Sequence, residues 1–458
     1  MMSFRPAFPF FLVSLLAAIL VGFHPARSDA GVSNPETFML DNGLQVVVVS
    51  QHRAPVVTHM VWYKVGSADE EDGKSGIAHL FEHLMFKGTK TYPAGEFSRR
   101  IAENGGRENA FTSYDYTGYY QTVAKDRLDM VMRFEADRMR NLILTQRELD
   151  TERNVVLEER RSRVENNPSA ILSEAANAAL YMNHPYRRPV IGWEHELKAL
   201  SVDDIRGFYD RWYRPENAIV VVAGDITAAD VRPLAERHYG AVLRGAGKGR
   251  AHFAEPPQRA ERTVELKDER VRQPSWSKSV LVAGYATARQ NGHANTPYII
   301  EVLSDILGGG GSSLLYRALA VDRQSAVSVG SYHSLHGRGP GRFGLYASPI
   351  PGVTLDMLAT EIETEIAAIL KRGITADEVA RAKRRLLAGA TYARDSISTA
   401  ARALGGALAV GQAIEDVERW PERIQAVTAE QVNAEARALF ARSGWVTSRL
   451  LPNGEGER

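Results

Sequence analysis

Two short patterns in the first half of the chain recur in the second half at almost the same distance. Residues 145–149 (TQREL) recur as residues 375–379 (TADEV), and residues 200–205 (LSVDDI) recur as residues 427–432 (VTAEQV). The two offsets, 230 and 227 residues, are nearly equal. Each pattern is also typical of a helix start, so either match alone is weak. Two matches in the same order at similar spacing predict a duplicated α+β domain, and 458 residues are enough for two such cores.

The first copy alternates strand patterns with helix patterns. Residues 38–50 alternate in polarity and become Val-rich around Asn42-Gly43, which predicts a β-hairpin that enters a sheet. Further strands are expected at residues 56–65, 109–113, 116–123 and 217–224, and helices at residues 97–104, 128–141, 146–164 and 228–238. Residues 241–261 are rich in Gly, Pro, Arg and Ala and lack periodicity. We interpret them as a linker between a first domain, 31–240, and a second domain, 262–458.

One short stretch of the first copy carries the residues of a metal site. His79, Glu82 and His83 read H-x-x-E-H, the reverse of the H-E-x-x-H order of other zinc hydrolases. On a helix, residues three and four apart lie on one face, so the two imidazoles can be directed at one metal ion. Neutral imidazoles suit zinc, and the neighbouring carboxylate can accept a proton from water. This is the minimum equipment for metal-assisted hydrolysis of an amide bond.

The alternative is that two His at this spacing occur by chance on an ordinary helix. The neighbouring residues argue against it, because Ser75 and Gly76 can begin a helix and Gly88 can end it. Apolar residues would pack around the polar trio, and a half-buried helix needs partners for such groups. The second copy has no His between His293 and His333, so it cannot carry the motif at the matching place. The predicted duplication is therefore chemically asymmetric.

A catalytic zinc ion usually has three protein ligands and one open position. The third ligand must come from elsewhere in the sequence, and the predicted helix 146–164 contains Glu148, Glu152, Glu158 and Glu159. Glu152 and Glu159 are two turns apart and share one face. Spacing alone does not choose among these four residues, and each could equally be a solvated glutamate on an outer face.

The amino-terminal segment has the pattern of a cleavable signal peptide at residues 1–30. Arg5 gives a positive start, and the apolar run 10–23 is short for a membrane span. Ser28-Asp29-Ala30 offers small residues for a signal peptidase, which would leave Gly31 as the first residue. The alternative is an uncleaved membrane anchor. We expect a periplasmic or secreted protein without a stable membrane span.

Composition excludes several other classes of protein. The chain has no Cys, which rules out disulfides, thiolate zinc sites and a cysteine nucleophile. Its net charge is +1, so there is no electrostatic case for binding nucleic acid or an anionic membrane.

These motifs resemble those of the pitrilysin family of inverted-motif zinc peptidases, in the branch that includes mitochondrial processing peptidase. The resemblance covers nearly the whole chain after the signal segment. It rests on residues 76–89 (GIAHLFEHLMFKGT), 109–112 (NAFT), 152–159 (ERNVVLEE), 184–186 (HPY), 213–217 (YRPEN) and 224–225 (GD). The family fold implies two similar α+β domains, each an antiparallel sheet packed with helices, which together form half of a clamshell around a closed chamber.

The resemblance also implies roles for particular residues. The family position of the third ligand falls on Glu159, which with His79 and His83 would bind one zinc ion per chain. Glu152 would support the site by orienting a ligand or a Lys or Arg partner, without binding the metal. Residues Asn109, Ala110, Phe111 and Thr112 resemble an edge strand that pairs with an extended peptide substrate. The alternative for this segment is an ordinary interior strand.

The chain departs from the family pattern in its second half. Active members use an Arg and a Tyr, seven residues apart, to hold the substrate carbonyl as it becomes an oxyanion. Here the two positions fall on Ala320 and Val327, and the nearby Arg317 and Arg323 do not fit the register. In the two-chain branch one subunit carries the zinc and its partner carries this pair. We therefore expect a heterodimer with a paralogous subunit.

The expected function is a zinc-dependent endopeptidase that cleaves short or unfolded polypeptides, with Glu82 as general base. Two rival hypotheses remain: a non-catalytic structural or assembly protein, and a chaperone-like module that encloses unfolded chains. The intact H-x-x-E-H motif argues against the first rival, although a fold alone does not determine function.

Overall fold

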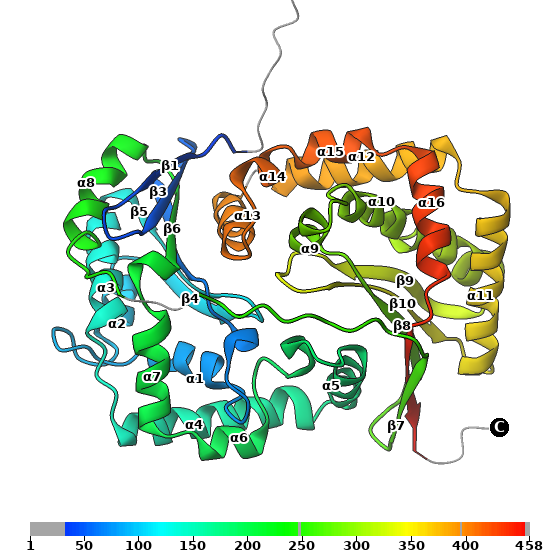
Figure 1. Cartoon of the computed structure of the whole chain (residues 1–458), viewed down its shortest axis with the longest axis horizontal. Coiled ribbons are helices and arrows are strands. Elements are labelled where there is room, and N and C mark those ends of the chain that lie inside the picture. The colour runs from blue at the N-terminus through cyan, green and yellow to red at the C-terminus, as the bar shows by residue number, and fades with distance from the viewer. Residues whose placement is uncertain (1–32, 246–248, 394–395, 454–458) are drawn as a thin grey trace, which may run out of the picture. The chain divides into compact units, whose positions relative to one another are not determined.

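The computed structural model of the protein describes residues 33–245, 249–393 and 396–453 (Figure 1). The predicted signal peptide, residues 1–30, lies outside the described residues. Within the described ranges, no helix is both long and apolar enough to cross a membrane.

The first half of the chain forms a six-stranded sheet in the order β1-β2-β6-β3-β5-β4. The strands are β1 (Glu36–Met39), β2 (Gln45–Ser50), β3 (Val56–Tyr63), β4 (Arg107–Thr112), β5 (Thr117–Ala124) and β6 (Ala218–Gly224). β1 and β2 form the predicted hairpin, and only the β2–β6 pair is parallel. A parallel pair needs a long connection, and here helices α1 to α7 lie between its two strands in the sequence.

The second half forms a five-stranded sheet in the order β7-β11-β8-β10-β9. Its strands are β7 (Arg262–Asp268), β8 (Ser275–Val282), β9 (Ala326–Ser334), β10 (Gly341–Pro349) and β11 (Val446–Pro452). Again a single pair, β7–β11, is parallel. The order matches β2-β6-β3-β5-β4 of the first sheet strand for strand. This match confirms the duplication that the recurring sequence patterns predicted.

The recurring patterns lie at equivalent helix starts. Thr145 accepts a hydrogen bond from the Glu148 N–H at 3.3 Å, and Thr375 accepts one from the Glu378 N–H at 3.2 Å. The helices of the first half are α1 (Ile77–Leu84), α2 (Glu96–Glu103), α3 (Leu128–Arg140), α4 (Gln146–Arg160), α5 (Pro168–Leu180), α6 (Glu194–Ala199), α7 (Val202–Trp212) and α8 (Ala228–His238). Those of the second half are α9 (Tyr285–Gln290), α10 (Thr296–Gly308), α11 (Leu355–Arg372), α12 (Ala376–Ala393), α13 (Ile397–Ala409), α14 (Ile414–Glu418), α15 (Trp420–Ala426) and α16 (Ala429–Phe440).

Each half covers its own sheet on one face and contributes one helix to the other half. Helices α1, α3, α4, α7 and α8 share one hydrophobic core with one face of the first sheet. The opposite face packs against α13 of the second half, while α5 of the first half packs against β7 and β11 (Figure 1). Every residue of β6 is therefore buried, which explains its unbroken apolar sequence. At the α13 contact, a Cβ on Gly405 would lie 2.1 Å from the Trp62 Nε1, so the close approach requires glycine.

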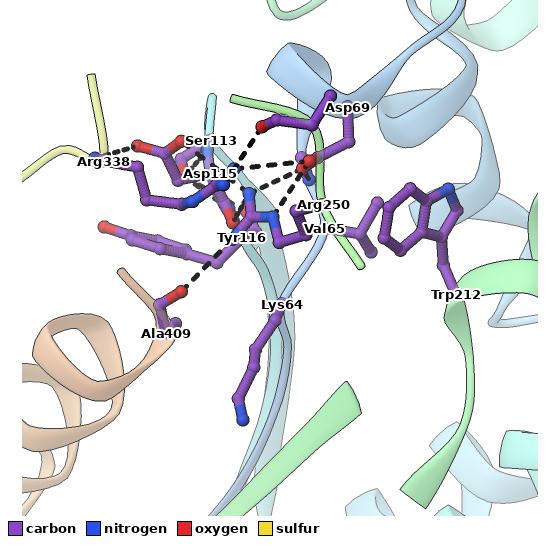
Figure 2. A network of polar contacts seen from close by, with 12 residues as sticks. Lys64, Val65, Asp69, Ser113, Asp115, Tyr116, Trp212, Arg250, Arg338 and Ala409 are labelled. Carbon is purple, nitrogen blue, oxygen red and sulfur yellow. Dashed lines mark hydrogen bonds and ion pairs between the residues drawn. The ribbon is translucent and has the colours of Figure 1, made fainter. Parts of the chain in front are cut away.

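The segment between the two sheets, residues 241–261, contains no helix or strand in its described part. Figure 2 shows that Arg250 of this segment reaches back to the first half. Its guanidinium donates to both carboxylate oxygens of Asp69, at 2.9 and 2.6 Å, and to the backbone oxygen of Asp115 at 2.8 Å. Arg338, on the β9–β10 connection, donates its backbone N–H to the Asp115 carboxylate at 3.0 Å. The Asp69 side chain is only 2% exposed, so this cluster of opposite charges is a buried attachment between the two halves.

Candidate metal centre

Helix α1 carries the H-x-x-E-H residues and is buried on almost all sides. It begins after Gly76, which has a φ of 87° and whose added Cβ would lie 2.7 Å from the Ile191 backbone oxygen. Its apolar residues join the core of the first half. The helix ends at Leu84, so the expectation that Gly88 ends it is wrong. The reason is a tighter turn, in which the Phe86 N–H donates to the His83 oxygen at 3.2 Å before the chain reaches Gly88.

The structure brings His79, His83 and Glu159 together at the junction of α1 and α4. The Glu159 Oε2 lies 3.6 Å from His79 Nε2 and 3.4 Å from His83 Nε2. The three possible ligand atoms all lie within 4.8 Å of one another. Tetrahedral ligands about 2.05 Å from a zinc ion are about 3.3 Å apart, so little movement is needed to close around a metal. The arrangement can hold one divalent cation.

The pKa values of the two histidines shift in opposite directions, although burial acts to lower both. Burial, followed by the nearby His83 and Arg163, lowers the pKa of His79 to about 3, so this imidazole is neutral at neutral pH. Burial also acts to lower the pKa of His83, but the Glu152 hydrogen bond and the nearby carboxylates raise it overall. A neutral imidazole is the form that binds a metal.

Of the four glutamates that spacing left open, two lie at the site and two lie away from it. Glu152 is buried beside His83, with its Oε2 at 3.4 Å from Nδ1, and its Oε1 pairs with Lys87 Nζ at 2.5 Å. Glu148 caps the start of α4, and Glu158 is exposed and pairs with Arg161. Glu152 therefore contacts a candidate metal ligand, His83, and a basic residue, Lys87, which are the two kinds of partner expected for it. Lys87 was not anticipated, although its position four residues after His83 was a possible signal.

Glu82 is 9% exposed and faces the end of strand β4. The Thr112 hydroxyl donates to its Oε2 at 2.5 Å, and burial raises its pKa. The sequence placed Thr112 only in a substrate-binding strand, so its bond to Glu82 was missed. The bond links the carboxylate of α1 to the strand at the edge of the sheet.

Strand β4, which contains Asn109, Ala110, Phe111 and Thr112, lies at the edge of the first sheet. It pairs with β5 on one side, and among the described strands nothing pairs with its other side. The alternative of an interior strand is therefore wrong. Phe111 turns away from α1 and packs on Trp62, whereas Thr112 turns toward Glu82.

The second half does not bring an Arg or Tyr to the two positions that the family pattern indicates. Ala320 lies in a π-helical segment, Tyr316–Asp322, and packs against the second core. Val327 lies on the edge strand β9 and is 57% exposed. Arg323 forms an ion pair with Glu365 at 2.8 Å. These positions supply no donor for a developing oxyanion.

Comparison with known proteins agrees with this fold. Residues 45–194 match the family model described as insulinase (peptidase family M16), and residues 199–386 match the model described as peptidase M16 inactive domain. The zinc protease PqqE of Helicobacter pylori is 34% identical over 351 residues, which cover 76% of this chain and 77% of that protein. The chain belongs to peptidase family M16.

Solved structures give the same result at the level of the fold. The crystal structure of a protease from Helicobacter pylori superposes with a TM-score of 0.85 at 29% identity, covering 92% of this chain and all of that one. The periplasmic protease PqqL from Escherichia coli superposes with a TM-score of 0.76 at 20% identity, covering 91% of this chain but 47% of that one. This chain therefore has the fold of about half of that longer protein. The family and its zinc-protease relatives support a zinc peptidase.

A further residue, Glu70, holds the start of α1 and was not anticipated from the sequence. Its carboxylate is 5% exposed and accepts the N–H groups of Gly76 at 3.1 Å and Ala78 at 3.0 Å. Burial raises its pKa to about 8, against the effect of those two hydrogen bonds. It satisfies N–H groups that the first turn of a helix leaves without partners.

Replacing Glu70 should change how stability depends on pH. Between its ordinary pKa of 4.5 and about 8, the folded state holds a proton that the unfolded state has released, so the contribution to stability falls as pH rises through this window. Glu70→Gln should remove this fall. The free energy of unfolding of Glu70→Gln minus that of the parent should therefore rise by about 3 kcal/mol between pH 5 and pH 8. Urea unfolding with chelator present measures this, with the exposed Glu103→Gln as control. Parallel pH curves for parent and Glu70→Gln would contradict the assignment.

Proposed function

We propose that this chain is a zinc-dependent endopeptidase whose metal ligands are His79, His83 and Glu159 and whose general base is Glu82. The observation that carries the proposal is the convergence of two imidazoles and one carboxylate within 4.8 Å, beside a second buried carboxylate. The relative from Helicobacter pylori is named a zinc protease, and the same chemistry suits the donor set here.

The residues present fit a zinc ion. The two carboxylate oxygens of Glu159 have different partners. Oε1 pairs with Arg163 at 2.6 Å, and Oε2 faces both histidines. His83 is oriented from behind by Glu152, which is the usual arrangement for a metal-binding histidine. A bound zinc ion supplies Lewis acidity, which makes water nucleophilic near neutral pH and polarises a carbonyl group.

Glu82 is placed to move the proton of the reaction. Thr112 occupies its Oε2, which leaves Oε1 to accept a proton from the attacking water. Burial raises the pKa of Glu82 and so strengthens it as a base. The same carboxyl group then returns the proton to the leaving amine nitrogen. The hydrogen bond from Thr112 fixes the carboxylate plane during both transfers.

The free edge of β4 suits an extended peptide as the substrate. Backbone groups along an unpaired edge can bind the backbone of any sequence, and side-chain pockets add preference. Because Thr112 ends β4 beside Glu82, a peptide that pairs with β4 passes the metal site. This geometry favours short or unfolded polypeptides, in accordance with a chamber that folded proteins cannot enter.

A second chain would complete the catalytic groups. The positions for the oxyanion-binding pair hold Ala320 and Val327. The fold of this chain matches 92% of the first half of PqqL and 47% of the full protein. The rest of PqqL is therefore long enough for a second unit of similar size. We propose that a paralogous subunit supplies the missing donors in a heterodimer. The predicted signal peptide would place this chain in the periplasm or outside the cell.

The non-catalytic alternative is favoured by one observation, the match of residues 199–386 to a model named for an inactive domain. That match excludes His79, Glu82, His83 and Glu159, all of which lie within the match to the insulinase model. The name therefore applies to the second half, where the metal motif is missing.

Replacing the base and replacing a ligand should have different effects. Glu82→Gln should keep about one zinc per chain but lose activity by about 100- to 10,000-fold, because proton transfer is lost. His83→Ala should lose both the zinc and the activity. Zinc content after dialysis and cleavage of a quenched peptide measure the two effects, with the exposed Glu158→Gln as a control on α4.

The same experiment separates the rival functions. Zinc retained by His83→Ala would contradict the ligand assignment, and full activity in Glu82→Gln would contradict the base. Bound zinc without cleavage of any peptide, by the chain or its native complex, would favour a structural protein. Peptide binding that survives chelation, again without cleavage, would favour a peptide-binding module.

Glu152 should tune the metal site without binding the metal. Glu152→Gln keeps the shape of the side chain but weakens its hold on His83 and leaves Lys87 without a counter-charge. We expect zinc affinity to fall about 10- to 100-fold. Competition with a chromophoric chelator measures the affinity, and Glu158→Gln, exposed on the same helix, is the matched control. Equal affinities for the parent and Glu152→Gln would show that Glu152 has no part in the site.

The heterodimer proposal predicts a slow isolated chain. Loss of an oxyanion donor typically costs about 100- to 1000-fold in rate, so the purified chain should cleave peptides more slowly than its native complex by about that factor. Co-purification from the native source, followed by peptidase assays of the chain and of the complex, measures the difference. An isolated chain as fast as the complex would contradict the need for a partner.

A further inference from the structure

A groove of about 810 Å³ begins where strand β4 ends. Its lining includes Ser113 and Tyr114, which follow Thr112 directly, and Val164, which lies one turn beyond Glu159. One wall comes from α5 and the other from the β9–β10 hairpin of the second half. A peptide that leaves the edge of β4 at Thr112 therefore continues into this groove.

The groove contains an arginine without an acidic partner. Arg342 of β10 lines the groove and is half-buried, and among the described residues no carboxylate forms an ion pair with it. Its guanidinium carbon lies 5.3 Å from the ring centre of Tyr332. Its charge also acts to lower the pKa values of Tyr114 and Tyr181, which burial raises. The guanidinium is thus supported by aromatic rings while its hydrogen-bond donors stay available.

The acidic residues of the groove are already occupied by other partners. Glu174 is held by both terminal nitrogens of Arg160, at 2.8 and 3.0 Å. The Asp115 carboxylate accepts the Tyr186 hydroxyl and the Arg338 N–H, and Figure 2 shows Asp115 within the cluster around Arg250. Arg187, also in the lining, has no ion pair among the described residues. The groove consequently presents a surplus of positive charge next to the metal site.

The remaining lining can accept polar side chains but adds no compensating charge. Ser169, Ser173 and Asn177 of α5 line the groove, and the Asn177 amide already donates to the Tyr114 hydroxyl at 3.0 Å. The Tyr181 hydroxyl donates to the Pro340 oxygen at 3.3 Å. A half-buried guanidinium is stabilised most by a carboxylate, with which it can form two parallel hydrogen bonds.

We propose that this groove is a substrate subsite that binds an acidic side chain, Asp or Glu, of the peptide, and that Arg342 is its specificity-determining residue. The proposal rests on the proposed peptidase function and names the class of peptide that the site selects. Because Arg342 belongs to the second half, the selectivity for substrate and the chemistry come from different halves of the duplicated chain.

Quenched peptides of neutral sequence with a single Glu, Gln or Lys test the proposal. The residue is moved through four positions on each side of the cleaved bond, with the native complex as the enzyme. At one position, kcat/KM should be at least about tenfold higher for Glu than for Gln, which corresponds to about 1.4 kcal/mol. Arg342→Gln should bring this ratio to about one, and Arg342→Glu should make Lys the preferred residue. Arg272→Gln, an exposed arginine outside the groove, should keep the parent ratio.

The reversal by Arg342→Glu is a result that mere loss of folding would not produce. No Glu preference at any position, or one that survives in Arg342→Gln, would overturn the proposal. Binding to the Glu82→Gln variant, followed by fluorescence anisotropy, separates the subsite from catalysis. A Glu preference that depends on Arg342 in binding supports the subsite even if no peptide is cleaved. Equal binding of Glu and Gln peptides overturns the subsite alone, and absence of any peptide binding overturns both proposals.

Discussion

The structure depends on four polar side chains, two of them buried and two half-buried, where α1 meets α4. His79, His83, Glu82 and Glu159 lie in or beside the core of the first half, where uncompensated polar groups are costly. Each has a partner on another element or faces the shared metal site. Positions on α1 therefore have to match α4 and β4 closely, and Glu70 holds the beginning of the helix in place. The precision that a metal site requires comes from the same contacts that make burial of these groups possible.

The chain consists of two halves with similar folds, and the two halves carry different functional residues. Five strands of the first half have the same order as the five of the second, yet among the described residues only the first half has a possible metal site. The halves exchange helices α5 and α13, and the buried contacts of Arg250 with Asp69 and Asp115 add a polar attachment. The groove next to the metal site has walls from both halves, so under the proposed subsite the second half would contribute to substrate binding.

Local sequence patterns predicted the local structure well. The spacing of His79, Glu82 and His83 was sufficient to predict their common helix face, and strand β4 was expected at its observed place. Glu159 could not be chosen from spacing, because periodicity on α4 does not say which glutamate meets α1, and the family resemblance was needed.

Contacts between distant segments could not be read from the sequence. The bond from Thr112 to Glu82 and the pair of Lys87 with Glu152 depend on how α1, α4 and β4 are placed by the core. That Arg342 has no ion pair among the described residues is visible only once the neighbouring carboxylates have been located. Likewise, an apolar helix pattern does not show which sheet the helix covers, so the exchange of α5 and α13 was not anticipated.

The central claim is that one zinc ion is held by residues of α1 and α4 in the first half. Anomalous diffraction from zinc-soaked crystals, with data on both sides of the zinc absorption edge, tests it most directly. One strong peak is expected about 2.0–2.2 Å from His79 Nε2, His83 Nε2 and the Glu159 carboxylate. A peak that lacks Glu159 as a ligand, or zinc bound only elsewhere, would contradict it.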